Sequence, residues 1–263
     1  MSTPPPVANW FQNGFHSFLR PFLKRHFHTV AVHSESSVVL GEIGPGPLIV
    51  FGNHPSWWDP LIAHLLCRRV FAPRQFYAPI DAAALEQYQV FRKLGFFGIE
   101  LNSKRGAAEF LKTSTSILQA PRTSLWLTPE GRFADSRDRD ATLMPGLAHL
   151  CSRMPAGGMA VAMALEYVFW EERLPECLVR FGPVIHCDQH ADLDKPAWHA
   201  LLTDSLRVTQ DLLATDSVAR SSAPFTPLLS GKRGAGSSYD SFRRLRATLT
   251  GGRFRAEHGR KFH

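Results

Sequence analysis

Residues 48–60 read LIVFGNHPSWWDP, four apolar residues followed by a loop of polar and aromatic ones. The apolar run predicts a buried strand, and the loop after it places His54 and Asp59 five positions apart. A proline follows each of these two residues, and proline disfavours the helical region for the residue before it. Both side chains are therefore expected on extended backbone, and they can converge if the chain reverses between them.

A histidine oriented by a carboxylate is a common general base, because the acid fixes the tautomer and stabilises the imidazolium that forms when a proton is taken. A structural interpretation remains open, since Asp59 and Pro60 also form a typical helix start, with Asp as the cap and Pro at the first helical position. His54 would then bond a neighbouring carbonyl. A carboxylate has two oxygens, so it can cap a helix and hold an imidazole at the same time.

The pattern Asn53-His54-x-x-x-x-Asp59 resembles the first signature of the glycerolipid acyltransferase family, whose members acylate glycerol 3-phosphate, lysophosphatidate and related lysolipids. The resemblance implies that His54 is the general base and that Asp59 orients it. It also implies that Asn53, next to the base, contributes to substrate binding.

A second stretch, residues 95–101, predicts a strand that leads into Ser103-Lys104-Arg105-Gly106. It resembles the family's second signature, in which an arginine holds the phosphate of the acceptor. Leu101 stands where that arginine would be, so the resemblance implies that Lys104 or Arg105 substitutes for it, or that the phosphate contact is absent. The plain alternative is two exposed cations ahead of a helix, whose N-terminus favours a bound anion.

A third stretch, Pro129-Glu130-Gly131-Arg132-Phe133, follows a predicted strand over residues 124–128. It resembles the family's third signature, with the arginine one position early, and implies that Glu130, Gly131 and Arg132 line the acceptor site opposite His54. Such a turn is also structurally ordinary, because glycine permits positive φ. A predicted strand over residues 159–165 lies where the fourth signature falls, without its usual proline. The resemblance covers roughly residues 45–185.

The composition favours one globular domain with anionic partners. The 263 residues are 44% hydrophobic, too apolar for disorder, and no run of 18 uncharged apolar residues predicts a membrane-spanning helix. Thirty Lys and Arg against 23 Asp and Glu give a formal charge of +7. The four cysteines form no C-x-x-C pair, and the N-terminus lacks the features of a secretory signal, so we expect a reducing, cytoplasmic environment.

Predicted strands and helices alternate along the chain, which indicates a single α/β domain with a mixed, largely parallel sheet flanked by helices. The predicted strands cover residues 29–33, 38–40, 48–51, 75–79, 95–101, 124–128, 159–165 and 177–184. The predicted helices cover residues 61–69, 81–92, 107–119, a segment opening at 144–150, and 197–214. We divide the chain into an amphipathic N-terminal segment (1–28), the acyltransferase domain (29–216) and a flexible basic tail (217–263).

The N-terminal segment carries an apolar stripe at helical spacing from Trp10 to Phe27, with Asn9 as the expected cap and Pro21 expected to split it into two short helices. Cations and histidines occupy its other face. Bulky aromatics with cations are typical of helices that lie on anionic lipid, although the same stripe would also pack on a core.

Two further features are ambiguous. The run His186-Cys187-Asp188-Gln189-His190 lacks the second ligand cluster of a structural zinc site, so we expect no metal. The tail from Gly231 is strongly basic, but it has no recognisable nucleic-acid-binding motif, and anionic lipid head groups suit it equally well. We expect a membrane partner and no nucleic acid.

Taken with the resemblance, these features imply an acyltransferase of phospholipid biosynthesis that moves a fatty acyl group from acyl-CoA or acyl carrier protein to a lipid hydroxyl. The commonest acceptor in the family is lysophosphatidate. The sequence contains no Gly-x-Ser-x-Gly motif, so we expect no serine nucleophile and a direct transfer. We expect no resident cofactor. The protein is expected at the cytoplasmic face of a membrane, by peripheral or monotopic attachment. The alternatives are an acyltransferase for a phosphate-free glycolipid or terpenoid alcohol, and a non-catalytic peripheral membrane protein of the same fold.

Overall fold

The computed structural model describes residues 3–71 and 73–231. The helices and strands, in chain order, are α1 (Asn9–His26), β1 (Thr29–His33), α2 (Ser36–Gly41), β2 (Leu48–Gly52), α3 (Asp59–Val70), β3 (Gln75–Asp81), α4 (Ala82–Gln87), η1 (Gln89–Leu94), β4 (Phe96–Ile99), α5 (Lys104–Leu118), β5 (Thr123–Leu127), α6 (Gly146–Cys151), β6 (Met159–Val168), β7 (Glu176–His186), η2 (Cys187–His190), α7 (Lys195–Ala219) and β8 (Phe225–Ser230).

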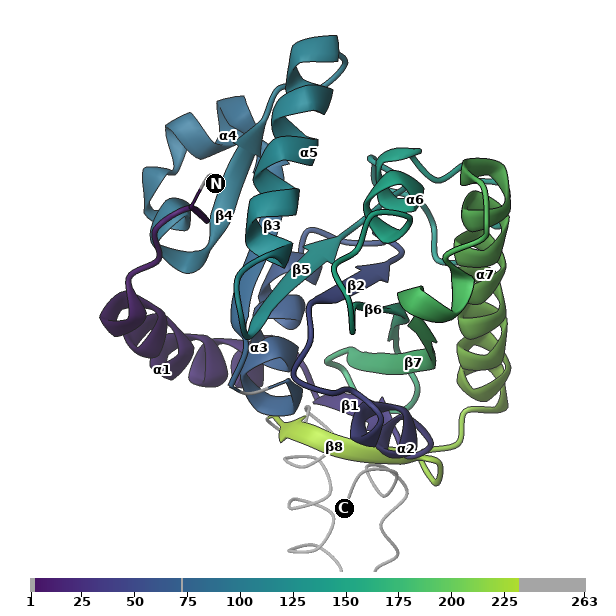
Figure 1. The fold of residues 1–263 in the computed structure, drawn as a ribbon. Helices are drawn as coiled ribbons and strands as arrows, with labels where there is room; N and C mark the ends of the chain where they lie inside the picture. The colour runs from purple at the N-terminus through teal and green to yellow at the C-terminus, as the bar shows by residue number, and fades with distance from the viewer. Residues whose placement is uncertain (1–2, 72, 232–263) are drawn as a thin grey trace, which may run out of the picture.

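One mixed sheet organises the molecule (Figure 1). Its strand order is β4-β3-β5-β2-β6-β7-β1-β8, and the first five of these strands run parallel to one another. β7 turns back antiparallel to β6, β1 runs parallel to β7, and β8 is antiparallel to β1. The predicted α/β class with a largely parallel sheet is therefore confirmed. We call the end where β2 to β6 finish the carboxyl edge, and the end where they begin the amino edge.

Helices cover both faces of the sheet, so its central strands are buried on both sides. Along β2, Leu48 and Val50 face a core shared with α1 and α3, whereas Ile49 and Phe51 face a core shared with α5, α6 and α7. Continuous apolar runs are typical of parallel strands in this position. The run that predicted the strand is thus explained by its central place in the sheet.

The N-terminal helix is present, but it is not split at Pro21. α1 runs unbroken from Asn9 to His26 with the proline exposed on its outer face. Leu19 and Leu23 are fully buried in the core shared with α3, and burial of such side chains offsets the roughly 3 kcal/mol that an interior proline costs a helix. Tertiary packing overrides the local signal here.

The segment after β1 was predicted as a strand over residues 38–40 and is instead the short helix α2. Three apolar residues are too few to distinguish the periodicity of a helix from that of a strand, so long-range contacts decide which one forms. Ser36 lies fully buried at the helix start, where its Oγ accepts a hydrogen bond from the backbone N–H of Phe181. Glu35, just before it, pairs with Arg180.

The helix predicted over residues 81–92 is divided into α4 and the 3-10 helix η1, which meet at Tyr88. Its predicted cap is correct, because Oδ1 of Asp81 accepts a hydrogen bond of 3.0 Å from the N–H of Ala83.

The sheet also reaches beyond residue 216, where we placed the end of the domain. α7 continues to Ala219, and β8 adds an edge strand that pairs with β1. The remainder of the predicted tail, residues 232–263, lies outside the described residues.

Candidate active site

The loop after β2 brings His54 and Asp59 together at the carboxyl edge. Residues 53–58 form no regular structure, and α3 begins at Asp59 with Pro60 in its first turn. Nδ1 of His54 lies 2.7 Å from Oδ2 of Asp59. The His54 side chain is 18% exposed and that of Asp59 is 4% exposed, so the imidazole reaches solvent while the carboxylate does not.

The Asp59 carboxylate is held by three donors. Besides His54, the backbone N–H of Ser56 donates to Oδ2 at 3.1 Å, and the hydroxyl of Tyr167 donates to Oδ1 at 2.6 Å. An ionised carboxylate only accepts, so Nδ1 of His54 is the donor in this contact, and in a neutral imidazole Nε2 is then the acceptor nitrogen. Asp59 therefore orients the imidazole rather than capping α3 with its side chain.

Tyr167 is a site residue that our sequence reasoning missed. It lies near the end of β6, on the same face of the sheet as Leu165, and packs against the ring of Phe27 with centroids 5.8 Å apart. Burial, together with Cys177 and Asp59, raises the pKa of Tyr167 well above its usual value, so the hydroxyl stays protonated as a donor. Strand parity indicated the face, but only the register of β6 against β2 places the hydroxyl on Asp59.

Asn53, predicted to bind substrate, is turned away from solvent. Its Nδ2 donates to the carbonyl of Leu165 at 3.0 Å, and its Oδ1 accepts from the N–H of Leu165 at 2.9 Å. The side chain thus continues the pairing of β2 with β6 by one step, just where Gly52 lies so close that a Cβ would meet the carbonyl oxygen of Met163 at 2.7 Å. Asn53 fixes the start of the loop, which positions His54.

Glu130, the second predicted acidic site residue, is also buried. Its side chain is 1% exposed and pairs at 2.8 Å with Nη1 of Arg207 on α7, 77 residues away. The same guanidinium bonds Gln210 and the carbonyl of Ala141. Nothing in the local sequence distinguishes Arg207 from other helical arginines. Gly131 adopts φ +65°, the conformation that glycine tolerates best, so this signature fixes a tight turn beside the dyad.

Two side chains of this turn are exposed. Arg132 pairs with Asp138 at 3.2 Å, and Phe133 packs on the His54 ring with centroids 4.3 Å apart and an interplanar angle of 30°. The N–H of Ala134 also donates to the carbonyl of His54 at 3.0 Å, which ties the two loops together. An aromatic side chain therefore covers the exposed side of the His54 ring.

Lys104 and Arg105, the predicted phosphate ligands, lie at the start of α5, beyond β4. Because β5 and β3 separate β2 from β4, this position is roughly 14 Å from the end of β2 along the same edge. Ser103 caps the helix by accepting from the N–H of Gly106, and Arg105 pairs with Glu109 in the same helix. The structure places these cations on the correct edge but not beside His54.

The aromatic loop residues connect the dyad to α1. Trp57 and Trp58 stack with centroids 4.2 Å apart, and Trp58 contacts Phe22, His26 and Phe27. Trp57 remains 58% exposed. The carboxyl end of α1 and the loop of residues 53–58 therefore form one continuous aromatic cluster.

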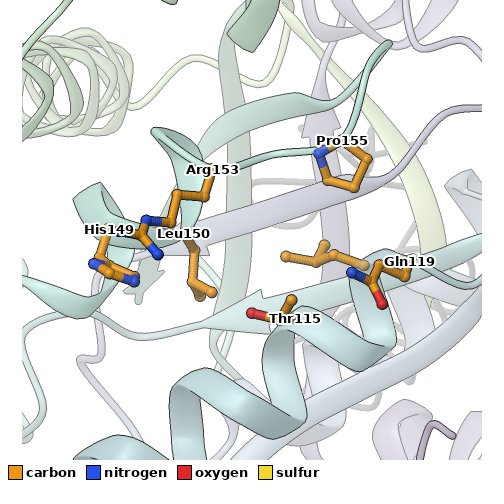
Figure 2. Close-up of a pocket in the computed structure, with 7 residues that line it drawn as sticks. Thr115, Gln119, His149, Leu150, Arg153 and Pro155 are labelled. Carbon is orange, nitrogen blue, oxygen red and sulfur yellow. The ribbon is translucent and has the colours of Figure 1, made fainter. Parts of the chain in front are cut away.

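A small pocket elsewhere offers no alternative site. It lies between α5 and α6, where Thr115, Gln119, His149 and Arg153 surround a space of about 30 Å³, enough for a water molecule (Figure 2). Among the described residues, no group of three or more His, Cys, Asp or Glu side chains is arranged to hold a metal ion.

A family model described as Acyltransferase matches residues 30–165, more than half of the chain. The match spans His54, Asp59 and the turn at Glu130, and it ends two residues before Tyr167. No curated protein matches the chain.

Proposed function

Because the chain belongs to the glycerolipid acyltransferase family, we propose that its reaction is transfer of a fatty acyl group from an acyl thioester, acyl-CoA or acyl carrier protein, to a lipid hydroxyl. One observation carries the assignment of the base: the 2.7 Å contact between His54 and a buried carboxylate at the carboxyl edge, the usual place for sites in open α/β sheets.

The geometry suits general base catalysis. The acceptor hydroxyl loses its proton to Nε2 of His54 as its oxygen attacks the thioester carbonyl, while Asp59 stabilises the imidazolium. The tetrahedral intermediate then collapses, the carbon–sulfur bond breaks, and the departing thiolate takes the proton from His54. The products are an ester and a free thiol, and the enzyme returns to its starting state. Tyr167 and the N–H of Ser56 keep the carboxylate in place throughout.

Replacing His54 with alanine tests this assignment. Labelled acyl-CoA would be supplied with liposomes and a panel of lysolipid, glycolipid and terpenoid alcohol acceptors. We expect H54A to lower the rate by about 10²–10⁴-fold, the usual contribution of a general base. His186→Ala, at the amino edge, is the matched control. If no acceptor is acylated, or if H54A keeps the wild-type rate, the protein is a non-catalytic member of the fold.

Lysophosphatidate is our first candidate acceptor, with Lys104 or Arg105 as the predicted cation for its phosphate. A specific observation favours the phosphate-free alternative. Close to the base, Arg132 is paired with Asp138 and the exposed ring of Phe133 covers the imidazole, while Leu101 is exposed beyond β4. An uncharged glycolipid or terpenoid alcohol would need no cation at these positions.

A matched pair of acceptors separates the two candidates. Lysophosphatidate and monoacylglycerol of the same chain length differ only in the phosphate. If the first is preferred, the lysophosphatidate proposal stands; if the second is preferred, the phosphate-free proposal replaces it. In the second case Asp138→Asn, which releases Arg132, should raise the use of lysophosphatidate by a few fold, whereas Asp192→Asn at an unrelated exposed site should not.

We propose that the protein binds peripherally to an anionic membrane, and that α1 makes the contact. The inner side of α1 is buried in the core, but Trp10 and Phe18 are 72% and 57% exposed, and Arg20, Lys24 and Arg25 are exposed beside them. Within residues 3–71 and 73–231, no helix is long and apolar enough to cross a bilayer. Exposed aromatics at the start and in the middle of α1 would hold the helix on lipid, and its end packs on the loop of His54 through Trp58.

Vesicle sedimentation tests the membrane proposal. Trp10→Ala with Phe18→Ala should weaken binding to anionic vesicles at least about tenfold, because each ring loses its burial in the interface. Leu212→Ala with Val218→Ala removes exposed apolar surface from α7 and should leave binding unchanged. Equal losses in both variants would contradict α1 as the contact.

A further inference from the structure

The amino edge carries an open cleft of about 720 Å³, far from the dyad. It is bounded by the first half of α1, the last turn of α3, and the residues just before β3 and β5. Its volume lies within the range of small-molecule sites, but its lining is not the usual apolar one. Four arginines line it, Arg68, Arg69, Arg74 and Arg122, together with His16, two asparagines and a glutamine. No aspartate or glutamate is among the lining residues.

The four arginine side chains differ in their hydrogen-bond partners. Arg74 bonds the backbone carbonyls of Gly44, Gly46 and Thr123, so it stabilises the fold. Arg68 bonds Asn13 across the cleft. Arg69 and Arg122 are exposed and make no side-chain hydrogen bond or ion pair with any described residue. Two guanidinium groups are therefore available, and they come from segments more than fifty residues apart in the chain.

The positive charge of the cleft affects the groups around it. Burial, and then Arg68, Arg20 and Arg69, lower the pKa of His16. Nδ1 of His16 is itself buried and has no hydrogen-bond partner in the described part of the chain. The helix dipole of α3 explains Arg68 and Arg69 in its last turn, but it does not explain Arg122, which lies beyond the end of α5, or a hollow with four arginines and no acidic side chain.

From this convergence of unpaired guanidinium groups in a cleft without acids, we propose that the amino edge is a binding site for phosphate groups. Arginine recognises phosphate through paired, charge-assisted hydrogen bonds, and the asparagine and glutamine side chains add neutral donors. The phosphate comes either from a soluble phosphorylated ligand or from the head group of an anionic lipid that meets α1. The site is independent of the proposed acyl transfer, since it lies at the opposite edge from His54.

Isothermal titration of the full-length protein with inorganic pyrophosphate tests the soluble source. Sedimentation with vesicles of phosphatidylglycerol and phosphatidylcholine, compared with phosphatidylcholine alone, tests the lipid source. The informative variant is Arg69→Ser with Arg122→Ser, which spares the structural Arg74. Arg153→Ser with Arg173→Ser removes the same charge from exposed positions outside the cleft. Thermal unfolding of both variants checks that they remain folded.

We expect the cleft variant to bind pyrophosphate, or anionic vesicles, at least about tenfold more weakly than the wild type, and the control to change less than twofold. Pyrophosphate binding identifies a soluble ligand; vesicle binding without pyrophosphate binding identifies a lipid head group. The proposal is overturned if the wild type binds neither probe, or if the two double variants lose affinity equally. H54A should retain the affinity, so loss of acyl transfer and loss of this site are distinguishable.

Discussion

The two edges of the sheet carry opposite chemistry. At the carboxyl edge three acids are buried and held: Asp59 by three donors, Glu130 by Arg207, and Glu176 by the N–H of Trp170. At the amino edge the arginines Arg69 and Arg122 are exposed and have no acidic partner among the described residues. Helix direction accounts for part of this polarity, because helices that follow parallel strands begin at the carboxyl edge and end at the amino edge. α3 shows both ends, with Asp59 in its first turn and Arg68 and Arg69 in its last.

The difference teaches which charges serve chemistry and which serve recognition. A buried carboxylate with a full set of donors is rigid and can orient a base. An exposed, unpaired arginine keeps most of its hydration and side-chain freedom when the chain folds, and it can still bind an anion. Substitutions on the two edges should therefore have different consequences, and each prediction below tests one part of that contrast.

The largest effect is expected at the dyad. Asp59→Asn removes the charge that stabilises the imidazolium and should lower the rate of acyl transfer by about 10²–10⁴-fold while the protein stays folded. The measurement is acyl transfer from labelled acyl-CoA, with Asp192→Asn at an exposed position as control. An active D59N enzyme would mean that the carboxylate is only structural.

A large effect on stability is expected for the ion pair of α7. Arg207→Ala leaves the buried Glu130 without its partner and should lower the free energy of unfolding by about 3–5 kcal/mol. Arg137→Ala breaks an exposed pair with Asp135, where solvent screens the charges, and should have a much smaller effect. Urea denaturation measures both, and similar values for the two would show that burial of the Glu130 pair carries no special weight.

A smaller effect is expected for Tyr167, which acts through Asp59. Tyr167→Phe removes one donor to the carboxylate, so kcat should fall about tenfold with KM little changed. Steady-state kinetics of acyl transfer separate the two constants. Tyr77→Phe loses a buried hydroxyl bonded to the carbonyl of Pro5 and is the matched control. A wild-type kcat in Y167F would mean that Tyr167 contributes only packing.

The smallest effect concerns pH. Burial raises the pKa of Glu176 to about 7, above the ordinary value of 4.5, so the folded protein holds a proton that the unfolded chain has released. Stability should therefore fall as pH rises from about 4.5 to about 7. We expect a loss of about 1–2 kcal/mol, because solvent near the carboxylate screens part of the effect. Glu176→Gln should give a shallower slope in thermal unfolding, and an unchanged slope would assign the effect to other groups.

The misinterpreted elements share a cause. The helix α2 and the unbroken α1 depend on contacts with β7 and with the core below α3, which local sequence does not specify. Asn53 and Glu130 were predicted to contact substrate, and in the structure both side chains are buried and hold loops. A polar residue next to a reactive loop gives the same sequence pattern whether its side chain faces the substrate or the protein interior.

The sequence alone determined the central strand, the loop after it and the pairing of His54 with Asp59, because chain connectivity keeps groups five residues apart within reach. It also determined the turn at Gly131, where a positive φ requires little more than the residue itself. The tertiary structure decided the rest: Tyr167 lies 108 residues from Asp59, Arg207 lies 77 from Glu130, and the arginine cleft joins three separate segments. Such contacts depend on strand register and helix packing, which only the whole fold fixes.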